Sequence, residues 1–350
     1  MRIDTFTTEN NDWGKIAQEA QRAEALGVDG FAIPEITGDP LLNAAMAVRA
    51  TEHIGVRTGI AVAFPRSPMV IAEQAWAIQR NSGGRFALGL GTQVKAHNER
   101  RFSTPWKAPR SRLVEYVEAL RAIWRCWELG ERLDYQGDHY QFSLMTPEFT
   151  PPKSNLPMVP VYLAAVRPRT IESAAAVADG LRLHAFCTKK YLEEVVWPAI
   201  ERGLQSAGRA RGSLDVCGGG FVMTGPDEAT VAKNREWVRY RVAFYGSTPA
   251  YRPVMELHGW DDLADKLLHM TKTGQWAKMA TEIPDEVLDE FCIYATYGEL
   301  PAAVEARFGG ISDAIELAFE NDTDLQVAAE VVSKIHSIKS GFEAPIDHYA

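Results

Sequence analysis

Residues 83–92 read GGRFALGLGT, and this stretch decides the class of fold. The paired glycines predict a turn, and the residues between Arg85 and Gly91 carry no polar side chain. A strand that is apolar on both faces is typical of a parallel sheet covered by helices. Glycine at the carboxyl end of such a strand lets another backbone or a flat ligand come close. The stretch therefore predicts an α/β protein with its site at the strand ends.

Strand and helix patterns alternate on both sides of this stretch. Asp12 and the pair Asp39-Pro40 are typical of helix starts, and Gly27 of a helix end. The expected strands are Arg2–Phe6, Val28–Pro34, Val56–Ala63, Arg85–Gly91, Val161–Ala165, Gly180–His184, Leu214–Met223 and Asp313–Phe319. Eight strand–helix units in one chain predict a (β/α)8 TIM barrel, and the alternative is an open doubly wound sheet.

Two segments interrupt the alternation, one after strand 4 and one after strand 7. The first holds a long loop, an amphipathic helix over Arg110–Leu129, a hairpin at Leu133–Phe142 and a proline-rich stretch. The second is mostly helical. Strand and helix patterns resume directly after each segment. We therefore interpret both as insertions, at about 93–160 and 226–297, in a single domain spanning residues 1–350.

The composition is that of an ordinary soluble globular protein, with 46% apolar and 24% charged residues. A net charge of −9 argues against nucleic acid and acidic membrane surfaces as partners. No apolar run reaches the ~18 residues of a membrane span, and the first residues pass directly into a strand rather than a signal peptide. The four scattered cysteines fit no metal spacing. We expect a cytoplasmic protein whose partner is a small molecule.

The side chains expected at the strand ends are mostly small and apolar. Metal-assisted or acid–base hydrolysis needs clustered carboxylates or histidines, and that pattern is missing from the sequence. The sequence also lacks the dinucleotide-binding glycine fingerprint, a P-loop, a zinc-protease helix motif and a nucleophile elbow. These observations favour a large flat cofactor that brings its own reactivity, and no metal.

A few ionisable residues lie at the expected mouth of the barrel. Glu35 follows the second strand and is either an ion-pair partner or a catalytic group. His97 lies in the long fourth loop, either in the site or in solvent, and His184 ends the sixth strand, where we favour a core histidine. Cations that could hold a phosphate follow several strands: Arg66, Lys95, Arg167, Arg169, Lys189 and Lys190. The helix start at Pro168–Thr170 offers free backbone N–H groups as well.

Five segments together resemble the bacterial luciferase-like monooxygenase superfamily, and specifically its coenzyme F420-dependent oxidoreductase branch. They are AEALGVDG at 23–30, TGIAVAF at 58–64, SGGRFALGLG at 82–91, VYLAA at 161–165 and ADG at 178–180. The resemblance implies hydride transfer between a deazaflavin and a small organic substrate, in a homodimer. The alternatives are a two-component FMN monooxygenase, which uses reduced flavin and oxygen, and a barrel that only binds a ligand.

The resemblance also implies roles for individual residues. A non-prolyl cis peptide behind the ring would fall at Gly59-Ile60 or Ile60-Ala61, and Gly89 and Gly91 would let the ring lie flat. The implied cofactor-binding residues are Gly59, Ile60, Ala61, Thr92, Asn98, Ala164, Ala165, Val166 and Arg167. We assign Glu35 and His97 to proton transfer. Ile36 stands where relatives often have histidine, and 93–95 holds no glutamate, which argues against a sugar-phosphate dehydrogenase.

Overall fold

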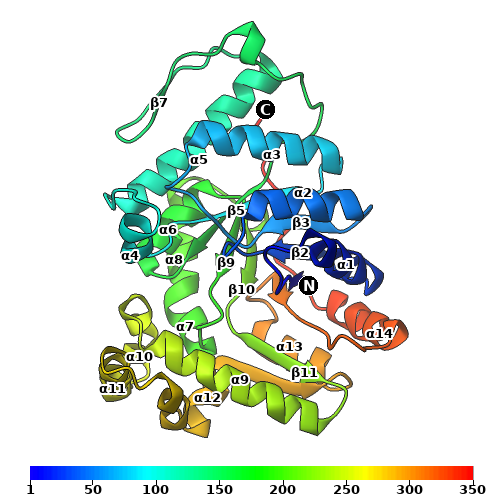
Figure 1. Ribbon diagram of the computed structural model, residues 1–350, viewed down its shortest axis with the longest axis vertical. Coiled ribbons are helices and arrows are strands. Elements are labelled where there is room, and N and C mark those ends of the chain that lie inside the picture. The colour runs from blue at the N-terminus through cyan, green and yellow to red at the C-terminus, as the bar shows by residue number, and fades with distance from the viewer. Residues whose placement is uncertain (350) are drawn as a thin grey trace.

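The computed structural model describes residues 1–349 and contains a closed parallel barrel (Figure 1). The strands follow the order β3-β2-β1-β13-β10-β9-β8-β5-β4, and β3 also pairs with β5, which closes the ring. Their bounds are β1 Arg2–Phe6, β2 Gly30–Ile33, β3 Gly55–Thr58, β4 Ala61–Val62, β5 Phe86–Gly91, β8 Val161–Ala165, β9 Gly180–Leu183, β10 Asp215–Gly218 and β13 Ala314–Glu316. The predicted TIM barrel is confirmed, and an open sheet, which would have two free edges, is excluded.

Helices surround the barrel. Their bounds are α1 Trp13–Ala25, α2 Pro40–Ala50, α3 Pro68–Ser82, α5 Pro109–Leu129, α6 Pro168–Val177, α8 Trp197–Ser206, α13 Leu300–Phe308 and α14 Leu325–His336. The predicted starts of α1 and α2 are confirmed. Asp12 accepts a hydrogen bond from the backbone N–H of Lys15, and Asp39 accepts from those of Leu41 and Leu42. Short polar side chains at these positions satisfy N–H groups that the first helical turn leaves free.

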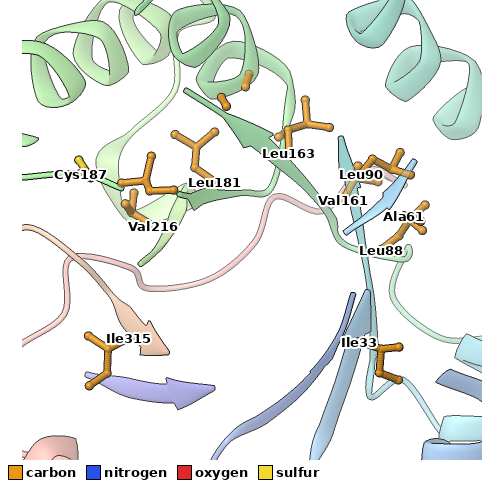
Figure 2. Close-up of a cluster of buried hydrophobic side chains, with 14 of the residues drawn as sticks. Ile33, Ala61, Leu88, Leu90, Val161, Leu163, Leu181, Cys187, Val216 and Ile315 are labelled. Carbon is orange, nitrogen blue, oxygen red and sulfur yellow. The ribbon is translucent and has the colours of Figure 1, made fainter. Parts of the chain in front are cut away.

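Alternate residues of the barrel strands pack outward against these helices. Figure 2 shows part of this buried apolar set, which includes Leu163 on β8, Leu181 on β9, Val216 on β10 and Ile315 on β13. A strand sends successive side chains to opposite faces. The residues between these apolar positions therefore point into the barrel.

Two of the expected strands are interrupted. The third ends with β3 at Thr58 and resumes as β4 at Ala61, and the peptide bond between Gly59 and Ile60 in the gap is cis. The seventh ends at Gly218, which has φ +87° and is followed by Gly219 with φ +105°. Such backbone conformations do not continue a strand. The chain resumes as β11 Phe221–Gly225, which pairs in parallel with β12 Cys292–Thr296 in a separate sheet, so a continuous seventh strand over Leu214–Met223 was wrong.

Further elements connect β5 to β8 and β11 to β12. The first connection contains α4 Lys95–Arg100, α5, the predicted hairpin with β6 Tyr135–Gln136 and β7 Gln141–Phe142, and the short helix η1 Pro147–Phe149. The second contains α9 Glu228–Gly246, η4 Pro249–Tyr251, α10 Arg252–Leu257, α11 Asp261–Lys272, η5 Trp276–Glu282 and α12 Asp285–Phe291. The hairpin and the α9–α12 group lie at opposite ends of the longest axis (Figure 1). Between β9 and β10 lie α7 Lys189–Tyr191, the π-helical turn η2 Leu192–Val196, α8 and η3 Arg211–Ser213.

The four cysteines, Cys126, Cys187, Cys217 and Cys292, are all buried and free. Within residues 1–349, no helix combines the length and the apolar character that a membrane crossing requires. The same residues contain no group of three or more His, Cys, Asp and Glu side chains arranged to hold a metal ion.

Candidate active site

An apolar surface lies where β4, β5 and β8 meet. A Cβ atom built on Gly91 would come within 2.8 Å of the Ile60 side chain and 3.5 Å of the Ala164 Cβ atom, so Gly91 adjoins both residues. Ile60 and Ala164 are half-buried and keep part of their surface free. The cis peptide between Gly59 and Ile60 occupies one of the two positions named from the sequence. We call the surface of Ile60, Gly91 and Ala164 the apolar floor.

We expected the glycines of β5 to leave bare backbone for a ligand. In the structure, other residues of the chain fill the space beside them. A Cβ atom on Gly89 would come within 2.0 Å of the Thr58 carbonyl oxygen. The Thr58 hydroxyl also donates to the Gly89 carbonyl at 2.7 Å and accepts from its N–H at 2.8 Å. At Gly91 the corresponding space is filled by Ile60. The glycines therefore let the irregular end of the third strand cross β5, and Ile60 presents the surface to a ligand.

Glu35 is held by an ion pair. Its carboxylate accepts from the Val62 N–H at 2.7 Å and from the two terminal nitrogens of Arg66 at 2.8 and 3.1 Å. The Glu35 side chain is only 5% exposed, and Arg66 also pairs with Asp39 at 2.9 Å. Arg66 is thus engaged by carboxylates and is a poor phosphate ligand. The geometry favours an anchoring role for Glu35, which fixes β4 under the mouth, over proton transfer.

Replacing Glu35 by glutamine is expected to lower the free energy of unfolding by about 1–3 kcal/mol, because it removes a charged acceptor from a half-buried guanidinium. Urea denaturation measures the change. The matched control is Glu99→Gln, which removes an exposed carboxylate 3.8 Å from Lys95 and should alter stability by less than about 0.5 kcal/mol. Equal stabilities of the two variants would contradict the anchoring role.

The short helix α4 is fastened to the end of β5 by Asn98. This side chain is fully buried, and its Nδ2 donates to the carbonyl oxygens of Thr92 at 2.8 Å and Val94 at 3.1 Å. Thr92 is half-buried, whereas His97 is exposed. Neighbouring helical residues point about 100° apart, so burial of Asn98 directs His97 outward. The structure brings Thr92 and Asn98 together and leaves His97 outside their contact.

The start of α6 lies beside the apolar floor. Ala165 is buried, Ala164 and Val166 are half-buried, and Arg167 is the exposed residue just before the helix. Within the described chain, the Arg167 guanidinium has no hydrogen-bonded or ion-pair partner. The first N–H groups of a helix lack intrahelical acceptors and attract anions. The four residues assigned to the phosphate side of a cofactor thus lie directly before a helix start, a feature that attracts anions.

Sequence reasoning missed an ion network inside the barrel. Asp4 is fully buried and contacts Arg57 at 3.0 Å and Arg182 at 2.9 Å. Burial alone would raise the pKa of Asp4, but the two guanidinium groups outweigh burial and hold that pKa below its usual range. Arg182 also pairs with Glu316, whose side chain is 39% exposed at the end of β13. The sequence did contain one signal for this network, because Arg182 is a charged residue at an inward-facing position of the apolar strand β9.

His184 extends the inward-facing positions of β9 by one residue beyond the strand. It is half-buried, and its Nδ1 accepts a hydrogen bond from the Phe186 N–H at 2.9 Å. Burial lowers the pKa of His184 to about 4, so the ring is neutral at neutral pH and carries its proton on Nε2. The ring lies 4.4 Å from that of Tyr245 and 4.6 Å from that of Tyr251. His184 therefore borders the mouth, with an aromatic wall beside it.

A hollow of about 690 Å³ lies elsewhere, on the outside of the barrel. It is lined by Trp76 of α3, Trp127 of α5 and Phe149 of η1, among others. In TIM barrels the chemistry takes place at the carboxyl ends of the strands. We therefore place the site at the apolar floor and the neighbouring mouth rather than in this hollow.

Comparison with known proteins identifies the class of enzyme. Residues 1–310 match the luciferase-like monooxygenase family, and the chain belongs to this family. Its relatives and structural neighbours include F420-dependent enzymes and a monooxygenase in complex with FMN. The protein is therefore an enzyme of the luciferase-like family.

Two relatives show how similar known sequences are to this chain. An uncharacterised protein of Mycobacterium tuberculosis (strain ATCC 25618 / H37Rv) is 41% identical over 305 residues, which are 87% of this chain and 90% of the relative. A 5,10-methylenetetrahydromethanopterin reductase of Archaeoglobus fulgidus is 29% identical over 253 residues, 70% of this chain and 71% of the relative.

Two solved structures share the fold over nearly the whole chain. The coenzyme F420-dependent tetrahydromethanopterin reductase from Methanopyrus kandleri has a TM-score of 0.77 at 19% identity, covering 97% of this chain and 99% of the other. The oxygenating constituent of 3,6-diketocamphane monooxygenase from Pseudomonas putida, in complex with FMN, has a TM-score of 0.69 at 12% identity, covering 99% of each chain.

Proposed function

We propose that this enzyme is a coenzyme F420-dependent oxidoreductase, which transfers a hydride between the deazaflavin and a small organic substrate. The observation that carries the proposal is the apolar floor with the start of α6 beside it. A tricyclic ring fits an apolar surface, and the phosphate on its side chain fits an anion site at one edge of that surface. When bound, the deazaflavin would supply the carbon atom that accepts or releases the hydride.

The residues named from the sequence take the following parts in this proposal. Gly59, Ile60 and Ala61 support one face of the ring. Thr92 contacts the edge of the ring, and Asn98 acts through Thr92 by holding its backbone in place. The remaining residues, Ala164, Ala165, Val166 and Arg167, surround the phosphate. No metal takes part.

For proton transfer we propose His97, an exposed residue of the helix α4 that follows β5, assisted by Glu35 as a positioning residue. Glu35 would act through the Val62 N–H and Arg66, which set the position of β4 and hence of the floor. The Mycobacterium relative has no described activity to compare. The relative from Archaeoglobus is named as a reductase, which supports this class over oxygen chemistry.

The test is a titration of the cofactor-free protein with oxidised coenzyme F420 and, separately, with FMN, followed by the change in cofactor fluorescence. We expect micromolar binding of F420 and binding of FMN at least about tenfold weaker. Arg167→Gln should weaken F420 binding about tenfold, because a charge-assisted contact to phosphate is lost. Lys153→Gln, which removes an exposed cation elsewhere, should not.

Micromolar binding of FMN without binding of F420 would contradict the proposal. That outcome would favour the two-component monooxygenase, for which the diketocamphane enzyme provides an example of FMN on this fold.

We also propose a homodimer in the cytoplasm, built from one domain that spans 1–350 with insertions at about 93–160 and 226–297. Leu42 on α2 and Val70 on α3 are exposed apolar side chains on adjacent helices, which favours an interface there. Sedimentation equilibrium of the whole chain measures the oligomeric state.

A further inference from the structure

The helix α9 places one face toward the ends of β9 and β13. Near its start, Asn234 donates to Glu320, beyond β13, at 3.1 Å. Near its end, the ring of Tyr245 meets the ring of His184, beyond β9, at 4.4 Å. Arg241 follows Asn234 by seven residues and precedes Tyr245 by four, so all three share one helix face. Arg241 therefore lies along the mouth of the barrel, between these two contacts.

Arg241 differs from the other arginines of α9 because its charge is not compensated. Arg235 pairs with Asp285 and Asp289, and Arg239 pairs with Glu236 and Asp285. Arg241 has no ion pair and no side-chain hydrogen bond within residues 1–349, and its Nε is buried without a partner. Its guanidinium instead stacks 4.7 Å from the centre of the Trp237 ring, which fixes its position.

Two further donors also lack an acceptor within residues 1–349: Tyr245, one helical turn after Arg241, and His184, whose ring meets that of Tyr245. Nδ1 of His184 is occupied by the Phe186 N–H, so the free nitrogen Nε2 carries the proton. The Tyr245 hydroxyl donates to no other group within the described chain. Burial raises the pKa of Tyr245, and the nearby charges of Arg241 and Glu316 act on it in opposite directions. The phenol thus stays protonated and available as a donor at neutral pH.

The carboxylates at the mouth already have partners, and that of Glu320 accepts from Asn234. Glu316 pairs with Arg182, and Arg182 pairs with Asp4, so these charges neutralise one another together with Arg57. Arg241 is left without an ion-pair partner within residues 1–349, and the neutral donor Tyr245 lies one turn along the same helix face. A cation and neighbouring neutral donors that lack acceptors are the kind of groups that an oxyanion requires.

We propose that Arg241, Tyr245 and His184 form an oxyanion subsite that binds a carboxylate or phosphate group of the substrate. The inference rests on the proposed function and narrows its substrate class to organic acids and phosphate esters. The oxyanion would bind on the α9 side of the mouth, and the apolar floor on the β4–β5–β8 side would remain free for the ring.

The subsite can be tested without cofactor or substrate, because Trp237 reports on Arg241. We would titrate the cofactor-free protein with sodium phosphate and, in a second arm, with sodium acetate, at constant ionic strength in chloride, and record tryptophan fluorescence. We expect a saturable change with at least one of the two probes and its loss in Trp237→Phe. Arg241→Gln should weaken the affinity at least about tenfold, as expected for a lost charge-assisted contact.

The matched control is Lys233→Gln, which removes one positive charge from an exposed position on another face of α9 and should change the affinity less than twofold. Saturation by phosphate alone would assign the subsite to phosphate esters, and saturation by acetate alone to carboxylates. Equal affinities of wild type and Arg241→Gln, or no saturable change in the wild type, would overturn the proposal. Because F420 is absent throughout, these outcomes are independent of the cofactor titration.

Discussion

Replacing Asp4 by asparagine is expected to lower the free energy of unfolding by about 3–5 kcal/mol, as measured by urea denaturation. Asp4 is fully buried between Arg57 and Arg182. Arg182 would keep Glu316, but Arg57 would remain buried without a carboxylate partner. A buried charge that loses its partner costs far more than the net value of the original pair, because it keeps the full cost of desolvation.

Two comparisons make this prediction specific. Asp138→Asn removes an exposed carboxylate in the hairpin and should change stability by less than about 0.5 kcal/mol. The double variant Asp4→Asn/Arg57→Gln should be more stable than Asp4→Asn alone, because the second change removes the unpaired cation. A double variant that is less stable than the single one would contradict the account.

The contribution of Asp4 to the free energy of unfolding should depend on pH in a defined direction. Since the folded protein holds the pKa of Asp4 below its usual range, its stabilisation is present above the unfolded pKa of about 4 and is lost as the pH falls through the folded value. The difference in stability between wild type and Asp4→Asn should therefore shrink in acid.

Gly89→Ala is expected to destabilise the protein by about 3 kcal/mol or more. The new methyl group would come within 2.0 Å of the Thr58 carbonyl oxygen, a backbone atom that cannot rotate away. Relief requires the end of β3 to move from β5 and to break the two hydrogen bonds between Thr58 and Gly89. The same shift would displace Ile60, so weaker cofactor binding should accompany the loss of stability.

A graded set of glycine substitutions checks the cause. Gly91→Ala would meet the Ile60 side chain at 2.8 Å, which can partly rotate away, so its cost should be smaller. Gly298→Ala meets nothing within 4 Å and should be nearly neutral. Similar unfolding midpoints for Gly89→Ala and Gly298→Ala would refute the steric argument.

The barrel could be predicted because the signals for its strands and helix starts each lie within a few residues of the sequence. An apolar run such as Phe86–Gly91, bounded by glycines, encodes a buried strand within a few residues, and the starts of α1 and α2 were visible at Asp12 and Asp39. The break in the seventh strand was missed, and at the break in the third strand only the cis peptide was named. Three consecutive glycines, Gly218 to Gly220, lie inside the expected seventh strand, but glycine also adopts extended conformations, so the sequence alone does not reveal that Gly218 and Gly219 have positive φ values.

Part of the candidate site could also be predicted, because the signals for that part are local as well. Strand ends are readable from the sequence, so the apolar floor and Arg167 were named in advance. The partner of Glu35 was not, because Arg66 reaches it only through the path of the chain after β4. Arg241 and Tyr245 were missed because nothing in the local pattern of α9 tells which face turns toward the mouth.

By itself, the sequence determined the strand–helix alternation, the family and the small, apolar character of the strand ends, since these depend on residues close together in the chain. Only the tertiary structure decided which charges meet. Asp4 and Arg182 are separated by 178 positions and become neighbours because the ring of strands closes. Ring closure is a long-range event, and it converts side chains that are unremarkable in sequence into a buried ion network beneath the mouth.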